Sequence, residues 1–130
     1  MSDITTNTYS ALTLANPLQE LLQQVEILLD VQVADEYSSL ELALRQLISA
    51  GGKRIRPRLV LLTGNLLGAD PNRLVHLAAA VEMLHTATLI HDDLIDESVL
   101  RRGMETLNVQ WTPAATVLTG DFAFTQAAEL

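Results

Sequence analysis

Three aspartates near the middle of the chain, Asp92, Asp93 and Asp96, have the clearest chemical potential. On a helix, at ~100° per residue, the side chains of Asp92 and Asp96 differ by ~40°, and His85 lies within ~20° of Asp92 two turns earlier. Paired carboxylates suit Mg²⁺, a hard cation that prefers oxygen ligands and retains several waters. Asp92 and Asp96 are therefore suitable ligands for Mg²⁺, while Asp93 points elsewhere and is better placed to support such a site.

A solvated acidic helix face is the simplest alternative to a metal site. The residues before the aspartates argue against it, because they are apolar and indicate a core helix; they include Met83, Leu84, Ala87, Leu89 and Ile90. The histidines His85 and His91 also have an ordinary alternative, since a histidine in a buried helix is more often a hydrogen-bonded core residue than a ligand.

The basic residues are few and clustered. Six of the eight lie in two groups, one formed by Lys53, Arg54, Arg56 and Arg58 and one by Arg101 and Arg102. The first group precedes a predicted helix that opens at Pro57, where free N–H groups and the helix dipole add to the positive charge. A phosphate-binding pocket is one interpretation of this group, and a solvated basic loop beside the end of the preceding helix is the alternative. The second group could instead stabilise the carbonyl end of the helix that carries the aspartates.

Composition indicates a small all-α protein. The chain has 130 residues, is 48% apolar and only 4% aromatic, and carries no cysteine. Long segments of Leu, Ala and Val favour a helical bundle over a β-sandwich. The net charge of −8 argues against nucleic acid as a partner. The lack of cysteine excludes disulfides, and we expect a cytoplasmic protein.

The ends of the predicted helices follow from capping residues. Asn16-Pro17 and Asp70-Pro71 can begin helices, and Gly51-Gly52 and Gly68 can end them. Residues 1–16 lack the basic residues of a targeting signal, so we expect a flexible arm there and a helical part over 17–130. The apolar run over 74–90 is interrupted by polar residues and predicts a core helix, with no integral membrane segment. The predicted helices span 17–30, 38–50, 57–67 and 71–97, and the last should be the longest.

Three motifs in this order closely resemble the polyprenyl synthetase family of trans-isoprenyl diphosphate synthases. They are Gly51-Gly52-Lys53-Arg54-Ile55-Arg56-Pro57, His85-Thr86-Ala87-Thr88-Leu89-Ile90-His91-Asp92-Asp93-Leu94-Ile95-Asp96-Glu97-Ser98 and Leu100-Arg101-Arg102-Gly103. Gly120-Asp121-Phe122 also matches. The resemblance covers about residues 40–130 and implies the N-terminal part of the class I isoprenoid synthase fold.

The resemblance implies a role for each motif. Asp92 and Asp96 would hold Mg²⁺ that bridges to an allylic diphosphate, and Arg101 would contact the same diphosphate. The diphosphate of isopentenyl diphosphate would be bound by Lys53, Arg56, His85 and Arg102. Ionisation of the allylic C–O bond would give a carbocation that the double bond of isopentenyl diphosphate attacks, yielding a longer all-trans polyprenyl diphosphate.

Product length is expected to depend on the residues before Asp92, because the growing tail in this family runs down that helix. Ala87 and Thr88 are small and would not block it, which predicts a product of geranylgeranyl length or longer, with Leu84 as the next possible stop.

Two departures from the family affect these expectations. Met104-Glu105 follow Arg102-Gly103 where the family often has a basic residue and proline. The family also has a second aspartate-rich motif on a later helix, so we expect this polypeptide alone to be inactive and to self-associate, or form a homodimer, through exposed helix faces. The alternative is a noncatalytic partner or regulatory subunit of a complete synthase. A cyclase uses similar aspartates but has no need for the upstream basic motif.

Overall fold

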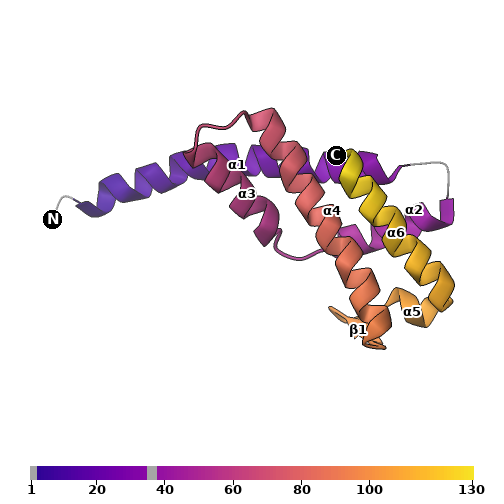
Figure 1. Ribbon diagram of the computed structural model, residues 1–130. Helices are drawn as coiled ribbons and strands as arrows, with labels where there is room; N and C mark the ends of the chain where they lie inside the picture. The colour runs from indigo at the N-terminus through magenta and orange to yellow at the C-terminus, as the bar shows by residue number, and fades with distance from the viewer. Residues whose placement is uncertain (1–2, 35–37) are drawn as a thin grey trace.

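The structure is a computed structural model that describes residues 3–34 and 38–130, and it is built almost entirely from helices. The all-α prediction is therefore confirmed. Figure 1 shows the order of the elements, which are α1 (Asp3–Val33), α2 (Ser38–Ser49), α3 (Ile55–Leu66), α4 (Pro71–Ile95), β1 (Leu100–Arg101), β2 (Met104–Glu105), α5 (Leu107–Gln110) and α6 (Pro113–Glu129).

Helix α4 is the centre of the fold. It packs most extensively against α6, and also against α3 and α1 (Figure 1). Its buried positions are mainly small or aliphatic, and Ala78, Ala79, Met83 and Ala87 are completely buried. Small residues on a central helix let neighbouring helices approach closely, and each fully buried large aliphatic side chain stabilises the fold by roughly 1.5–3 kcal/mol. By length and composition α4 could cross a membrane, but half of its most apolar window is buried inside the fold, as in a core helix.

The ends of α4 and α6 follow the same chemistry. Asp70 caps α4 by accepting a hydrogen bond of 3.0 Å from the Asn72 backbone N–H, and Pro71 occupies the first turn. Thr112 caps α6 through the N–H of Ala115 at 3.2 Å, and Pro113 follows. Both caps satisfy N–H groups that would otherwise lack partners. The predicted start of α4 is confirmed.

The hairpin after α4 positions the second basic pair. Leu100 pairs with Glu105, and Arg101 pairs with Met104. The two residues of the turn, Arg102 and Gly103, have φ values of 51° and 77°. Two consecutive positive φ values form a type I′ turn, which matches the twist of a hairpin. Sequence reasoning did not predict this hairpin, because its strands are only two residues long.

Two predicted helix boundaries were wrong. Helix α1 begins at Asp3 rather than at Pro17 and, with 31 residues, it is longer than α4 with 25. Helix α3 begins at Ile55 rather than Pro57, because Arg54 adopts a left-handed conformation (φ 53°) and starts the helix two residues earlier. Arg56 therefore lies in the first turn of α3 and not in the preceding loop. The flexibility expected for residues 1–16 stays a prediction.

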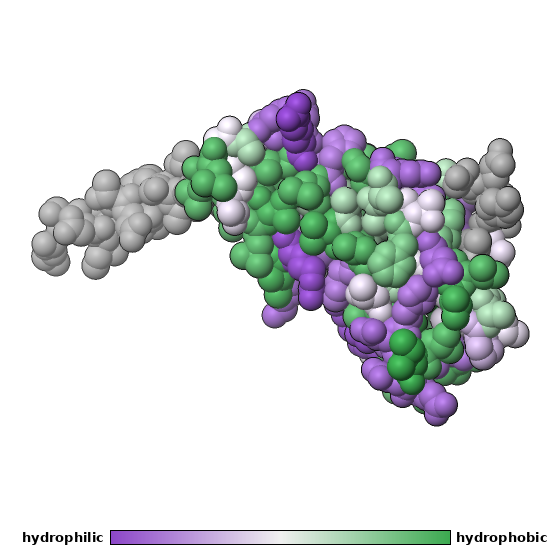
Figure 2. Space-filling model, in the orientation of Figure 1, coloured by the Kyte–Doolittle hydropathy of each residue, from purple (hydrophilic) through white to green (hydrophobic). Residues whose placement is uncertain are grey.

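Apolar side chains remain exposed over α3 and α4. Leu66 and Leu67 are 85% and 80% exposed, and Leu59, Leu62, Leu77 and Leu84 are also exposed. Figure 2 shows apolar residues gathered across this part of the surface. Exposed apolar faces of this kind are typical of surfaces that pack against another helix.

Candidate functional site

The three aspartates differ in their surroundings. Asp92 and Asp96 are exposed at the C-terminal end of α4, where the backbone N–H of Asp96 donates to the Asp92 carbonyl at 2.9 Å. Asp93 is buried, with only 5% of its surface exposed. The geometry thus leaves two carboxylates of the string accessible to a cation. Among the described residues no group of three metal-ligating side chains occurs, so a metal here would take its remaining ligands from water or from a bound anion.

Asp93 pairs with Arg101 across the turn between α4 and β1. Arg101 donates from Nε to Oδ2 at 2.8 Å and from Nη2 to Oδ1 at 2.6 Å. This hydrogen bonding raises the pKa of Arg101, and the negative charges of Asp93, Asp92 and Asp96 raise it further, although burial opposes them. The bidentate pair uses one edge of the guanidinium. It leaves Nη1 without a hydrogen bond to any described residue.

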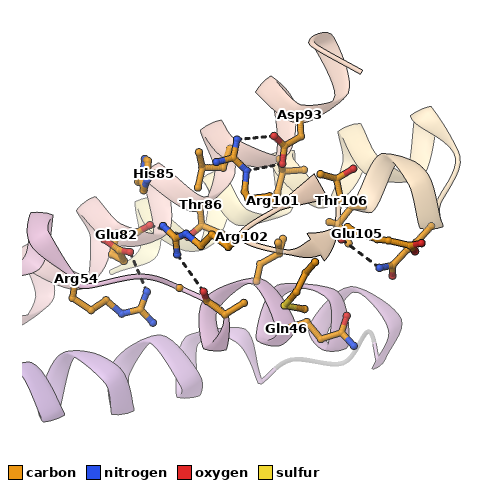
Figure 3. A pocket seen from close by; sticks show the side chains of 18 residues that line it. Gln46, Arg54, Glu82, His85, Thr86, Asp93, Arg101, Arg102, Glu105 and Thr106 are labelled. Atoms are coloured by element: carbon orange, nitrogen blue, oxygen red, sulfur yellow. Dashed lines mark hydrogen bonds and ion pairs between the residues drawn. The ribbon is translucent and has the colours of Figure 1, made fainter. Parts of the chain in front are cut away.

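His85 lies among cations. It lines a cavity together with Arg101 and Arg102, shown in Figure 3. Burial lowers the pKa of His85, the positive charge of Arg56 lowers it further, and Glu82 opposes the shift. Positive charges that lower the pKa of a histidine would also stabilise an anion bound beside it.

Arg102 connects the hairpin to the Gly51-Gly52-Lys53 loop. Its Nη1 donates to the carbonyl of Ala50 at 3.2 Å, and Figure 3 shows the side chain reaching across to the loop. A Cβ atom on Gly52 would lie 3.0–3.1 Å from three atoms of the guanidinium. Glycine at this position therefore permits the close approach of Arg102.

The remaining cations of the first basic motif divide into two kinds. Lys53 and Arg56 are exposed and have no acidic partner among the described side chains. Arg54, in contrast, turns inward and pairs with Glu26 and Glu82. Sequence reasoning had no role for Glu82, although its place within a long apolar run was a signal that could have found a buried partner.

The structure therefore brings some predicted site residues together and not others. His85, Arg101 and Arg102 share one cavity, and Asp93 lines it too. Lys53, Arg56, Asp92 and Asp96 do not line that cavity, but Arg56 is close enough to shift the pKa of His85, and both outer aspartates act on the pKa of Arg101.

The residues expected to govern product length also differ in exposure. Ala87 is completely buried in the core, whereas Leu84 is 45% exposed. Thr88 is half-buried, and its hydroxyl donates to the His85 carbonyl at 2.7 Å. The outward face of α4 before the aspartates thus presents Leu84 and Thr88 rather than Ala87.

Comparison with known proteins identifies relatives along most of the chain. The model of the polyprenyl synthetase family matches residues 37–130. Heptaprenyl diphosphate synthase component 2 of Geobacillus stearothermophilus is 42% identical over 112 residues, which are 86% of this chain and 35% of the relative. Octaprenyl diphosphate synthase of Escherichia coli (strain K12) is 48% identical over 84 residues, which are 65% of this chain and 26% of the relative.

Solved structures of such synthases have the same fold. A polyprenyl synthase from Caulobacter crescentus CB15, complexed with calcium and isoprenyl diphosphate, superposes with a TM-score of 0.83 at 40% identity and covers 89% of this chain and 35% of its own. A decaprenyl diphosphate synthase from Rhodobacter capsulatus gives a TM-score of 0.82 at 42% identity, covering 90% of this chain and 36% of its own. The chain spans about a third of the length of these relatives. Because the family model matches residues 37–130 and the fold is shared, the chain belongs to the polyprenyl synthetase family.

Proposed function

We propose that this chain carries two diphosphate-binding sites of a trans-prenyltransferase, one that works through Mg²⁺ and one that works through direct cations. The observation that carries the proposal is that Arg101 is held by Asp93, the neighbour of Asp92, and lines the same cavity as His85 and Arg102. Its charge also acts on Asp92, Asp96 and His85.

The first site would bind an allylic diphosphate. Asp92 and Asp96 are exposed carboxylates at one helix end, and such oxygens fit Mg²⁺. Bound Mg²⁺ would neutralise the diphosphate and stabilise it as a leaving group. Arg101 would add a charge-assisted hydrogen bond from Nη1, since Asp93 already holds its other edge. This assigns Asp92, Asp96 and Arg101 the catalytic roles.

The second site would bind the diphosphate of isopentenyl diphosphate. Lys53, Arg56 and Arg102 form no ion pair with a described acid, Arg102 and His85 line the same cavity, and the charges of Arg56 and Arg102 both act on His85. A diphosphate would lower the electrostatic repulsion within this group and would favour the protonated form of His85. Two anions would then be held on either side of Arg101, as a condensation between two diphosphate esters requires.

The chemistry that these residues support is transfer of a prenyl group. Departure of diphosphate from the allylic carbon would leave a carbocation, which the double bond of isopentenyl diphosphate attacks before a proton is lost. Leu84 and Thr88 on the outward face of α4 would lie along the growing tail. We propose a product of geranylgeranyl length or longer, and cytoplasmic location and homodimerisation through the exposed α3 and α4 side chains are part of the same proposal.

Ligand binding tests the division into two sites. Calorimetric titration of the chain with farnesyl diphosphate should require Mg²⁺ and should fail in Asp96→Asn, whereas titration with isopentenyl diphosphate should proceed without Mg²⁺. Losing one charged hydrogen bond in Arg56→Gln should weaken the second ligand roughly 10- to 100-fold. Equal effects of each variant on both ligands would contradict the proposal. Glu20→Gln, an exposed acid on α1, is the control and should change neither ligand.

A noncatalytic partner of a complete synthase is the second candidate. Its support is a name, because two relatives, from Geobacillus stearothermophilus and Bacillus subtilis, are each called component 2 of a heptaprenyl diphosphate synthase. Product analysis after incubation with Mg²⁺, farnesyl diphosphate and isopentenyl diphosphate distinguishes the two. Because the chain alone is expected to be inactive, longer prenyl diphosphates formed by a complete synthase that carries this chain would favour the enzyme, and activation of a separate complete synthase by the added chain would favour the partner.

A further inference from the structure

Arg54 lies between Lys53 and Arg56 in the sequence but behaves differently from both. Its backbone is left-handed (φ 53°) and its side chain is only 10% exposed, while Lys53 and Arg56 are exposed. A left-handed conformation is uncommon for a residue with a Cβ and persists where surrounding contacts over-determine it. The contacts of the Arg54 side chain therefore bear on the conformation of this loop.

The guanidinium of Arg54 joins three helices. Its Nη2 donates to Glu26 Oε2 on α1 at 3.1 Å and to the carbonyl of Ile48 on α2 at 2.7 Å. Its Nη1 donates to Glu82 Oε1 on α4 at 3.0 Å, a pair visible in Figure 3. Nε donates to the second oxygen of Glu26. The planar fork of arginine can satisfy all these acceptors at once, which the single ammonium of lysine cannot do.

The position of the Arg54 side chain also favours glycine at position 51. A Cβ atom on Gly51 would overlap Nη1 of Arg54 and would also lie 2.6 Å from the backbone oxygen of Ile48. A Cβ atom on Gly52 would make a tight contact of 3.0–3.1 Å with the guanidinium of Arg102. Glycine at positions 51 and 52 thus leaves room for two arginine side chains, that of Arg54 and that of Arg102 from the hairpin. Lys53 follows these glycines directly in the sequence.

Glu82 makes this arrangement dependent on Arg54. The side chain of Glu82 is 8% exposed, and its Oε2 is buried without a hydrogen-bond partner among the described residues. A buried carboxylate is unfavourable unless it is paired. Removing the fork of Arg54 would leave Glu82 uncompensated beside His85, and the loop would have to rearrange to supply a donor or water.

We propose that Arg54 is the positioning residue of the second diphosphate site, which fixes the loop so that Lys53 and Arg56 face a common anion without itself touching the anion. The inference rests on the proposed function, because it assigns the anion to isopentenyl diphosphate. Arg56 lies two residues beyond Arg54, in the first turn of α3, and the Lys53 carbonyl accepts from Arg58 Nε at 2.9 Å. Both ends of the loop are thereby held relative to Arg54.

The test compares Arg54→Lys with Arg45→Met. Arg45 is the control because it also joins α1 to α2, with Asp30 on α1 and Glu41 on its own helix, and among the described residues its ion pairs and hydrogen bonds involve only these two acids. Arg54→Lys keeps the charge and loses the fork. Calorimetry should show isopentenyl diphosphate binding weakened by roughly 10-fold in Arg54→Lys, with Mg²⁺-dependent farnesyl diphosphate binding within about twofold of the unaltered chain. Arg45→Met should leave both ligands within about twofold while lowering the urea midpoint.

A second variant covers the case in which Arg54→Lys does not fold. Glu26→Gln removes the charge of the exposed partner, which is 48% exposed, and keeps the buried pair with Glu82. It should weaken the same ligand by a smaller factor. Unchanged binding of isopentenyl diphosphate in the folded variants, or equal weakening of both ligands, would overturn the positioning role alone. Failure of the unaltered chain to bind isopentenyl diphosphate would overturn the proposed function and this inference together.

Discussion

Arg101 holds Asp93 through two parallel hydrogen bonds of 2.8 and 2.6 Å. The Asp93 side chain is 7% exposed and the Arg101 side chain 34% exposed, so the pair extends from the core toward the surface. Asp93 is consequently unavailable as a metal ligand while this pair is intact. Of the three aspartates, Asp93 thus orients Arg101, whereas Asp92 and Asp96 remain accessible.

Replacing Asp93 by Asn should destabilise the fold and displace Arg101. A hydrogen bond to a charged group contributes about 1.5–3 kcal/mol, and we expect the lower end because solvent screens the partly exposed Arg101. Urea unfolding at pH 7 measures the loss. The neighbouring substitution Asp92→Asn should change the free energy of unfolding by less than about 0.5 kcal/mol, since Asp92 is exposed. Equal losses in the two variants would contradict this difference between the aspartates.

The helices and the acid string could be predicted because their signals are local. Asp70-Pro71 marks the start of α4, and the spacing of Asp92 and Asp96 follows from the helical repeat. The separate position of Asp93 followed from the same repeat. By contrast, α1 continues through Pro17 to Asp3, and no local pattern predicted that extension.

The partners of Arg54 could not be predicted from the sequence. Both acids, Glu26 and Glu82, lie 28 positions away along the chain, one on each side. Among the four clustered basic residues it is Arg54 that turns inward, because the packing of α1 and α4 places these two acids near it. The residues beside Arg54 in the sequence do not determine this. The same holds for Arg101 and Arg102, whose directions are set by a two-residue turn.

The pH dependence of the free energy of unfolding should reveal the lowered pKa of His85. Burial and the charge of Arg56 lower its pKa below 6.5 in the folded chain. Between the pKa of the folded and that of the unfolded chain, the unfolded chain binds more protons. The contribution of His85 to the free energy of unfolding is therefore complete above pH 6.5 and is lost as the pH falls through the pKa of His85 in the folded chain. Urea unfolding from about pH 7 to about pH 5 should decline less steeply in His85→Gln than in the unaltered chain. Identical slopes would show that His85 is not perturbed.

A bound diphosphate should reverse the shift of His85. An anion beside the imidazole favours its charged form and raises the pKa. NMR titration of the His85 ring with and without inorganic diphosphate measures the change, and His76, which is exposed on the same helix, serves as the internal control. A fall in the pKa of His85 on adding diphosphate would contradict the proposed second site.

Gly120 should not tolerate a side chain. A Cβ atom there would overlap the imidazole of His91, whose Nε2 donates to the Val117 carbonyl at 3.2 Å and whose ring lies tilted against that of Phe124, with the ring centres 5.5 Å apart. Overpacking of this kind destabilises by about 1–3 kcal/mol, so Gly120→Ala should lower the urea midpoint. In the double variant with His91→Ala the clash is absent, and the combined loss should be smaller than the sum of the single losses. Strict additivity would show that the two residues do not meet.

Product length should respond most directly to Thr88. If the tail grows along the outward face of α4, Thr88 lies ~6 Å and Leu84 ~12 Å before Asp92 along the helix. In a complete synthase that carries this chain, Thr88→Phe should therefore shorten the product and Leu84→Ala should lengthen it, as measured by mass spectrometry of the prenyl diphosphates. Ala87→Phe is also expected to shorten the product, but Ala87 is completely buried, and the added ring should destabilise the fold by about 1–3 kcal/mol. Unchanged products in Thr88→Phe and Leu84→Ala would mean that the tail does not follow this helix, whatever Ala87→Phe does.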